Sequence, residues 1–159
     1  MPESHLRIDT HTHVVPPEYL TWLRANSDYR GSLIDWRLDS ALEAMDASGI
    51  GTAILSVPRP GVQWGPGDDP AQVRRLARTV NEFCGDVVRD DHEHFGFFAT
   101  LALPDLEASL KEARYALDDL RADGIVLLSP VDATYVGSPR LPNSCSPASV
   151  VSGSLADSR

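Results

Sequence analysis

Short apolar runs alternate along this sequence with longer stretches in which apolar residues recur at steps of three and four. The runs at residues 6–10, 50–57, 94–101 and 125–128 predict strands, and the stretches between them are typical of amphipathic helices, with a further short helix over 16–26. The second run is rich in branched apolar residues without polar alternation, as expected for a parallel strand covered on both faces. The order of strands and helices therefore predicts parallel strands joined by right-handed crossovers, in an α/β sheet or a barrel.

Glycine, proline and aspartate residues mark the expected helix ends. Gly49 stands where a left-handed cap would close the first crossover helix. Asp69 precedes Pro70, the arrangement of an N-cap followed by proline at the first helical position. A third crossover helix is expected to begin at Pro104–Asp105. The helix after Pro70 has one continuous apolar face, made of Val73, Leu76, Ala77, Val80, Phe83, Cys84, Val87 and Val88.

The sequence changes character after Leu141. Residues 142–159 are dominated by serine and show neither a helical nor a strand period, which is typical of an unstructured segment. We therefore expect a truncated barrel domain over residues 1–140 and an unstructured tail over 141–159, as a shifted reading frame would produce. The length of 159 residues allows one domain with one core.

Charge and composition argue against several classes of protein. Fourteen basic and twenty-three acidic residues give a net charge of −9, which repels nucleic-acid phosphates and anionic lipid surfaces. The start of the sequence lacks the features of a signal peptide, and no run reaches the ~18 apolar residues of a membrane-spanning helix. We therefore expect a cytoplasmic protein that binds neither nucleic acid nor membranes. Cys84 and Cys145 fit neither a thiolate metal site nor a disulfide framework, and Cys84 is expected to pack within its helix face.

The residues that can carry chemistry lie at the end of the first predicted strand. Asp9, His11 and His13 are two residues apart, so an extended strand would project them to one face. Neutral imidazole nitrogens suit divalent zinc, manganese or iron ions, and the carboxyl ends of barrel strands form the catalytic face. The pattern predicts a site for a divalent zinc, manganese or iron ion, with His11 and His13 as ligands and Asp9 as an accessory residue. The alternative is a loop that carries two surface histidines.

Two other features bear on the predicted site. His92 and His94 have the same spacing but precede a strand, which places them on the opposite, structural face as solvated or packing residues. The loop after the second strand carries Arg59 and Trp64, a cation and a ring suited to a carboxylate-bearing or aromatic substrate. Simple solvation is the alternative interpretation of this loop arginine.

Several blocks of the sequence resemble one known family. Residues 8–17, Ile-Asp-Thr-His-Thr-His-Val-Val-Pro-Pro, are similar to the opening of amidohydrolase-related proteins akin to aminocarboxymuconate-semialdehyde decarboxylase. The likeness runs from about Arg7 to Pro139, which is nearly all of this chain but only the first half of a typical member. Further blocks continue it at residues 44–57, 80–83, 95–105 and 123–128, of which 95–105 is the most specific.

The resemblance implies a fold, a cofactor and a reaction. The fold is the N-terminal half of a (β/α)8 barrel with about four parallel strands, and the reaction is metal-dependent, commonly zinc-dependent, non-oxidative decarboxylation of a small carboxylated compound. His11 and His13 would be the first two metal ligands, whereas the family's further metal-binding His, its catalytic His and its later Asp have no counterpart here. This chain would then be a fragment of a carboxy-lyase that is inactive by itself, with a full-length form able to pair into homodimers.

Three alternatives stay open at this point. A metal-dependent hydrolase of the same superfamily would share these features, because the side chains that separate hydrolysis from decarboxylation are absent from this sequence. Barrel phosphoesterases and nucleases also begin with a strand ending in His-x-His, although block 95–105 argues against them. The third alternative is a non-catalytic remnant of a disrupted gene.

Overall fold

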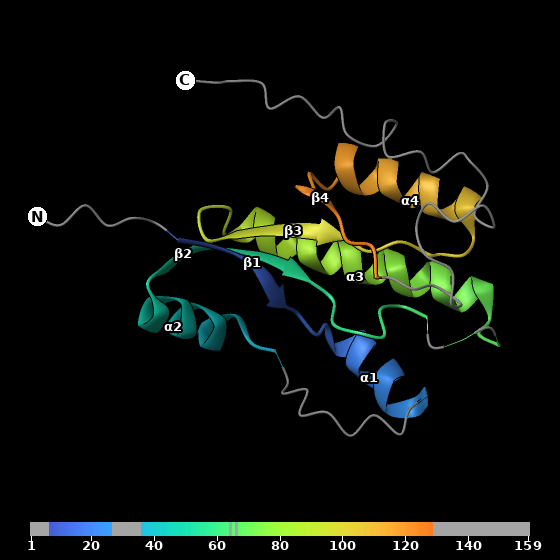
Figure 1. The fold of residues 1–159 in the computed structure, drawn as a ribbon, viewed down its shortest axis with the longest axis horizontal. Helices are drawn as coiled ribbons and strands as arrows, with labels where there is room; N and C mark the ends of the chain where they lie inside the picture. Colours follow the sequence, from blue (N-terminus) through green and yellow to red (C-terminus); the bar gives the residue numbers. More distant parts are fainter. Residues whose placement is uncertain (1–6, 27–35, 64, 66, 129–159) are drawn as a thin grey trace, which may run out of the picture. The chain divides into compact units, whose positions relative to one another are not determined.

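The computed structural model describes residues 7–26, 36–63, 65 and 67–128 of the chain. The chain divides into two units, Met1–Leu127 and Leu128–Arg159, and every described helix and strand lies in the first unit. Figure 1 shows strands and helices alternating along the chain, as the sequence predicts. The elements are β1 (Arg7–His13), α1 (Pro17–Asn26), α2 (Leu38–Ser48), β2 (Ile50–Ser56), α3 (Pro70–Asp90), β3 (Phe95–Ala99), α4 (Leu106–Asp118) and β4 (Gly124–Ile125).

The four strands form one sheet in the order β1-β2-β3-β4, and every neighbouring pair is parallel. Each strand therefore pairs with the next one along the chain, across a helical crossover. Because the strands are parallel, their carboxyl ends all lie at the same end of the sheet. This is the arrangement of strands in a barrel segment, with the residues that follow β1, β2 and β3 gathered at the end where barrel enzymes carry their sites.

Two strands differ in length from those predicted. β1 extends to His13 instead of ending at Thr10, because its last residues still pair with β2. β4 consists only of Gly124–Ile125 instead of residues 125–128, because its pairing with β3 ends at Ile125. An apolar run marks where a strand lies, but the neighbouring strand decides where the ladder of hydrogen bonds stops.

The predicted helix ends are confirmed. Gly49 has φ +66° and closes α2, a backbone conformation that glycine adopts without steric cost. The Asp69 carboxylate accepts a hydrogen bond from the backbone N–H of Ala71 at 3.0 Å, which caps α3. Asp105 caps α4 in the same way, by accepting from the N–H of Ala108 at 3.0 Å.

The apolar face of α3 supplies one side of the core, and α3 packs against β3 and against α4. Phe97 of β3 and Leu55 of β2 are fully buried within this cluster. Cys84 of α3 is 2% exposed, and burial raises the pKa of its thiol to about 12. The thiol is therefore protonated and packs as a small apolar group, as the sequence predicts.

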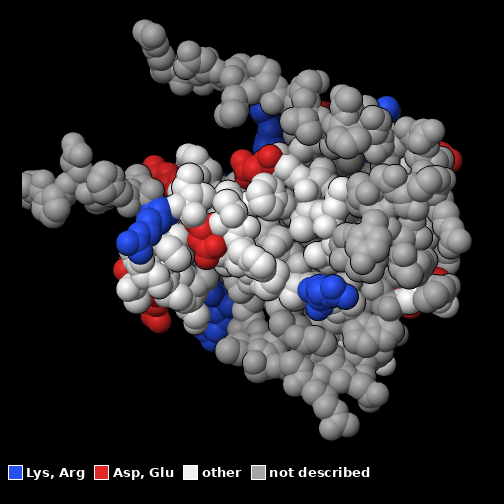
Figure 2. Space-filling view, in the orientation of Figure 1, with Lys and Arg blue, Asp and Glu red and all other residues white. Residues whose placement is uncertain are grey.

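The described surface carries charges of both signs, which are interspersed on the face shown in Figure 2. None of the described helices is long and apolar enough to cross a membrane. The tail predicted over residues 141–159 lies outside the described residues, so its unstructured character stays a prediction.

Candidate functional site

His11 and His13 lie at the carboxyl end of β1. Their ring centroids are 5.0 Å apart, with the ring planes at 71°, and both side chains are exposed. Two accessible imidazoles side by side can be reached by a metal ion from solvent. The structure thus brings together the two residues that the sequence predicts as metal ligands.

A bulge in β1 shapes this end of the strand. Asp9 lies opposite Ala53 of β2, whereas Thr12 lies opposite Leu55, so three residue steps of β1 face two of β2. Such an extra residue interrupts the ladder and changes the direction of the side chains around it. The regular alternation that the sequence predicts from Asp9 to His13 is therefore interrupted between Asp9 and Thr12, the segment that contains His11.

The Asp9 carboxylate bonds to the bulged segment. Its Oδ1 accepts from the backbone N–H of His11 at 2.9 Å, and its Oδ2 accepts from Thr12 Oγ1 at 3.0 Å. These hydrogen bonds, first the one from the His11 N–H, hold the pKa of Asp9 below its usual range. Asp9 therefore bonds to the backbone of one predicted ligand, and its accessory role at a metal site stays a prediction.

His13 has a polar neighbour on β2. The Oγ of the buried Ser56 lies 3.5 Å from His13 Nδ1, near the long limit for a hydrogen bond. The backbone N–H of Val14 donates to the carbonyl oxygen of Ser56 at 2.9 Å, which ties the chain after β1 to the end of β2. A hydrogen bond at Nδ1 leaves Nε2 for a metal ion, and such a partner is the usual companion of a ligating histidine.

The two histidines fit part of a metal site. Imidazole nitrogen is a suitable donor for divalent transition metals, and catalytic zinc sites generally use three protein ligands. Within the described ranges, no group of three or more His, Cys, Asp or Glu residues is placed to hold a metal ion. Any further protein ligand has to come from outside these residues or from another chain.

The loop after β2 is held by α1. Tyr19 is fully buried, and its hydroxyl shares its donor between the carbonyl oxygens of Pro58, at 3.1 Å, and Gly61, at 2.9 Å. These residues lie on either side of Arg59, whose side chain is exposed. The backbone that carries the predicted substrate-binding arginine is therefore fixed, whereas Trp64 lies outside the described residues.

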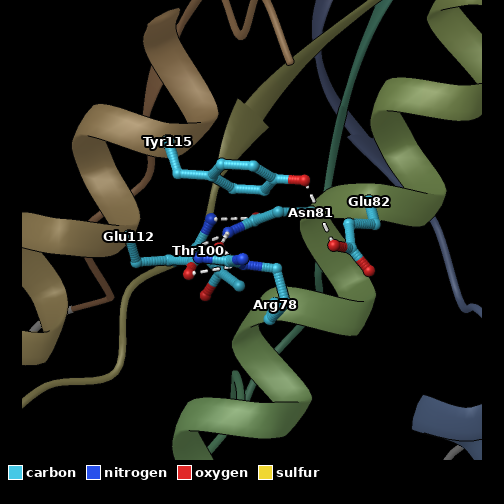
Figure 3. Close-up of polar contacts among 6 residues, drawn as sticks. All are labelled: Arg78, Asn81, Glu82, Thr100, Glu112 and Tyr115. Carbon is cyan, nitrogen blue, oxygen red and sulfur yellow. Dashed lines mark hydrogen bonds and ion pairs between the residues drawn. The ribbon is translucent and has the colours of Figure 1, made fainter. Parts of the chain in front are cut away.

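A buried asparagine holds the chain at the carboxyl end of β3 (Figure 3). Asn81 of α3 is 1% exposed, and its Oδ1 accepts from the backbone N–H of Thr100 at 2.9 Å. Its Nδ2 donates to the carbonyl oxygen of Thr100 at 3.0 Å and to Glu112 Oε1 at 2.9 Å. The side-chain amide thus pairs with both backbone groups of the residue that follows β3, as a neighbouring strand would.

Glu112 extends this cluster to α4. Its buried carboxylate accepts from Arg78 Nε at 2.9 Å, and the guanidinium carbon of Arg78 lies 3.7 Å from the ring centroid of Tyr115. The Tyr115 hydroxyl in turn donates to Glu82 at 3.2 Å, as Figure 3 shows. Sequence reasoning missed these residues, although a polar residue within the apolar face of α3, namely Asn81, is a signal that could have revealed them.

The second His-x-His pair lies at the opposite end of the sheet. His92 and His94 are exposed and precede β3, and His94 Nδ1 lies 2.8 Å from Asp91 Oδ1. His94 also lines an open groove together with Arg7, at the amino end of β1. This pair is therefore solvated on the structural face, as the sequence predicts.

The curated proteins to which this chain is similar include decarboxylases, whereas no protein-family model matches it. Decarboxylase yanB of Aspergillus niger is 37% identical over 137 residues, which cover 82% of this chain and 37% of that protein. The 6-methylsalicylic acid decarboxylase acuB of Aspergillus aculeatus is 35% identical over 137 residues, covering 83% of this chain and 41% of that protein. The chain therefore spans about two fifths of the length of the curated relatives it matches.

Solved structures match the fold. A crystal structure of amidohydrolase II has a TM-score of 0.76 at 28% identity, covering 86% of this chain and 44% of that one. A dihydroxybenzoic acid decarboxylase of a Polaromonas species with bound manganese has a TM-score of 0.63 at 27% identity, covering 76% and 37%. The predicted fold class and the predicted likeness to amidohydrolase-related decarboxylases are confirmed. These neighbours support a divalent metal, with manganese rather than zinc as the ion they name.

Proposed function

Since this chain is homologous to decarboxylases and shares the fold of amidohydrolase-related enzymes, we propose that it is the metal-binding part of a carboxy-lyase. The proposed substrate is a small aromatic carboxylate, and the proposed domain covers residues 1–140, before an unstructured segment over 141–159. The observation that carries this proposal is the exposed pair of imidazoles, His11 and His13, at the carboxyl end of β1.

The two imidazoles would hold a divalent metal ion, which when bound would polarise a substrate oxygen. His11 and His13 serve as ligands in their neutral form, and Asp9 holds the backbone of the first while Ser56 contacts the ring of the second. We expect Zn²⁺ to bind this pair more tightly than Mn²⁺, because Zn²⁺ lies above Mn²⁺ in the affinity order of nitrogen ligands. Manganese is the second ion to test, since the Polaromonas neighbour carries it.

Arg59 is the proposed contact for the substrate carboxylate, because a guanidinium can bind a carboxylate through two parallel hydrogen bonds. A solved decarboxylase with 30% identity is complexed with 2,6-dihydroxybenzoate, and the Aspergillus aculeatus relative is named for 6-methylsalicylic acid. Both compounds are hydroxybenzoates, which suggests a hydroxybenzoate for this chain and Trp64 as its stacking partner. The names of these relatives favour decarboxylation over hydrolysis.

Titration calorimetry of the purified 159-residue chain with Zn²⁺ and with Mn²⁺ tests the proposal. Binding is expected for the wild-type chain, and replacing both His11 and His13 by alanine should lower the affinity roughly tenfold or more, because both ligands are lost. The matched control replaces both His92 and His94 by alanine, the same change at the opposite end of the sheet. Failure of the wild-type chain to bind, or an equal loss in both double variants, would refute the proposed site.

The 159-residue chain is proposed to bind metal without turning over substrate, because it lacks counterparts of the residues to which the resemblance assigns proton transfer. Decarboxylation of 2,6-dihydroxybenzoate at the rate of the metal-only blank is the expected result. Turnover that is lost in the variant without His11 and His13 would show instead that the chain is a complete enzyme.

A further inference from the structure

The two predicted metal ligands are attached to the sheet in different ways. His13 lies opposite Ser56 in the register of β1 and β2, so the ladder between the strands holds its backbone. His11 lies within the bulge, between the paired residues Asp9 and Thr12, and has no paired residue of its own on the described strand β2. The backbone at His11 therefore depends on other contacts.

The Asp9 carboxylate supplies these contacts. One of its oxygens accepts from the backbone N–H of His11 at 2.9 Å, and the other accepts from Thr12 Oγ1 at 3.0 Å. A single side chain thus bonds to both residues that lead from Asp9 towards His13. Hydrogen bonds to an ionised acceptor are stronger than those to a neutral one, so a carboxylate suits this partly exposed position, where water competes for the same donors.

The separation of the two rings is the property that these hydrogen bonds would maintain. The ring centroids of His11 and His13 are 5.0 Å apart. Two imidazoles that bind one tetrahedral zinc ion through nitrogens about 2.0–2.1 Å from it have ring centroids roughly 5 Å apart. Rings that already lie at this separation lose less conformational freedom when an ion binds, so the metal-free arrangement favours binding.

We propose that Asp9 is a positioning residue of the metal site, whose carboxylate holds the backbone of His11 so that its ring stays beside His13 before an ion is bound. Within the described residues, Asp9 and the two histidines do not form a group placed to hold one ion. Both oxygens of Asp9 already accept hydrogen bonds from the chain. Asp9 therefore acts through His11, and its contribution to metal binding rests on the proposed function.

Nuclear magnetic resonance of the metal-free chain tests the positioning itself. The ring protons of His11 and His13 should show a nuclear Overhauser effect in the wild type, because the rings are in contact. Asp9→Ala should lose this effect, and its His11 amide should exchange faster with solvent, because the hydrogen bond to the carboxylate is gone. Asp9→Asn keeps an oxygen that can accept from the same N–H, so it should retain both signals. Asp46→Ala is the matched control, since it removes an exposed aspartate from α2.

Calorimetry with Zn²⁺ then tests the consequence for binding. Asp9→Ala should lower the affinity of the folded chain about tenfold or more, the usual effect of losing a residue that orients a ligand, whereas Asp9→Asn should bind about as tightly as wild type. Equal losses in these two variants would indicate that Asp9 binds the ion directly, and would overturn the inference.

Two further results separate the inference from the proposed function. If Asp9→Ala loses stability in urea but keeps the ring contact and the affinity for Zn²⁺, Asp9 has only a structural role and the inference is wrong. If the wild-type chain binds no Zn²⁺ while Asp9→Ala still loses the ring contact, the proposed function fails and the effect of Asp9 on the two rings stands.

Discussion

Replacing Asn81 by alanine removes the polar link between α3 and the residue that follows β3. The variant loses hydrogen bonds of 2.9 and 3.0 Å to the backbone of Thr100 and one of 2.9 Å to Glu112. Thr100 is 4% exposed, so water cannot readily replace the lost partners. Leaving a buried backbone group without a partner costs about 1–3 kcal/mol. The two groups of Thr100 therefore predict a loss of about 2–6 kcal/mol, while Glu112 keeps its ion pair with Arg78.

Urea unfolding monitored by circular dichroism measures this loss. With a slope of about 1.5 kcal/mol per M, the midpoint should fall by about 1–4 M relative to wild type. Gln72→Ala is the matched control, because it removes an exposed side-chain amide from the same helix. Surface changes of this kind usually alter stability by less than about 0.5 kcal/mol.

Hydrogen exchange of the Thr100 amide gives a second, local measurement. The wild-type amide should be protected by its bond to Asn81, and the alanine variant should exchange faster at this position than its global loss of stability explains. A stability loss below about 1 kcal/mol, together with an amide that stays protected, would refute the reasoning. Such a result would mean that another group satisfies the end of β3.

Two further predictions concern other contacts of the sheet and its helices. Gly96→Ala should cost about 1–3 kcal/mol in the same urea titration, because a Cβ there would lie 2.8 Å from Ile54 Cδ1 and also against the Asp123 carboxylate. A change below about 0.5 kcal/mol would show that the side chains of Ile54 and Asp123 can move to make room. Asp105→Asn keeps a capping oxygen but loses the ion pair with Arg74 at 2.7 Å. A backbone N–H of α4 and Arg74 hold the pKa of Asp105 below its usual range, so its ionised form stabilises the fold above the ordinary carboxyl pKa, and this contribution disappears as the pH falls through the lowered pKa. The thermal midpoints of wild type and variant should therefore differ at pH 7 and approach each other as the pH falls below the ordinary Asp pKa of about 4. A difference that stays constant with pH would contradict this explanation.

Features encoded by neighbouring residues could be predicted from the sequence. Gly49 closes α2 and Asp69 caps α3 because each acts on backbone groups within a few residues of itself. The parallel arrangement of the strands could also be predicted from local patterns. An apolar run such as β2 that lies between two amphipathic helices indicates a parallel strand covered on both faces. The position of His11 and His13 at a strand end followed from the same patterns.

Features that depend on distant residues could not be predicted. The bulge between Asp9 and Thr12 is defined only by the register of β2, more than 40 positions away along the chain. Asn81 looked like an interruption of the apolar face of α3, because its partners Thr100 and Glu112 lie 19 and 31 residues further on. A sequence pattern shows that such a polar residue is buried, but only the fold shows which backbone it satisfies.

The carboxyl ends of three successive strands are each fixed by a polar side chain that bonds to the backbone. Asp9 bonds to the chain at the end of β1, Tyr19 to the loop after β2 and Asn81 to the residue after β3. All three side chains and their partners lie within the described part of this chain, and the pairing of β1 with β2 also holds the backbone around His11 and His13. The geometry of the two imidazoles should therefore be present in a single chain, while a stable metal complex still requires additional ligands. Weak metal binding by the 159-residue chain would then follow from the number of ligands alone, with no change in the structure around the two histidines.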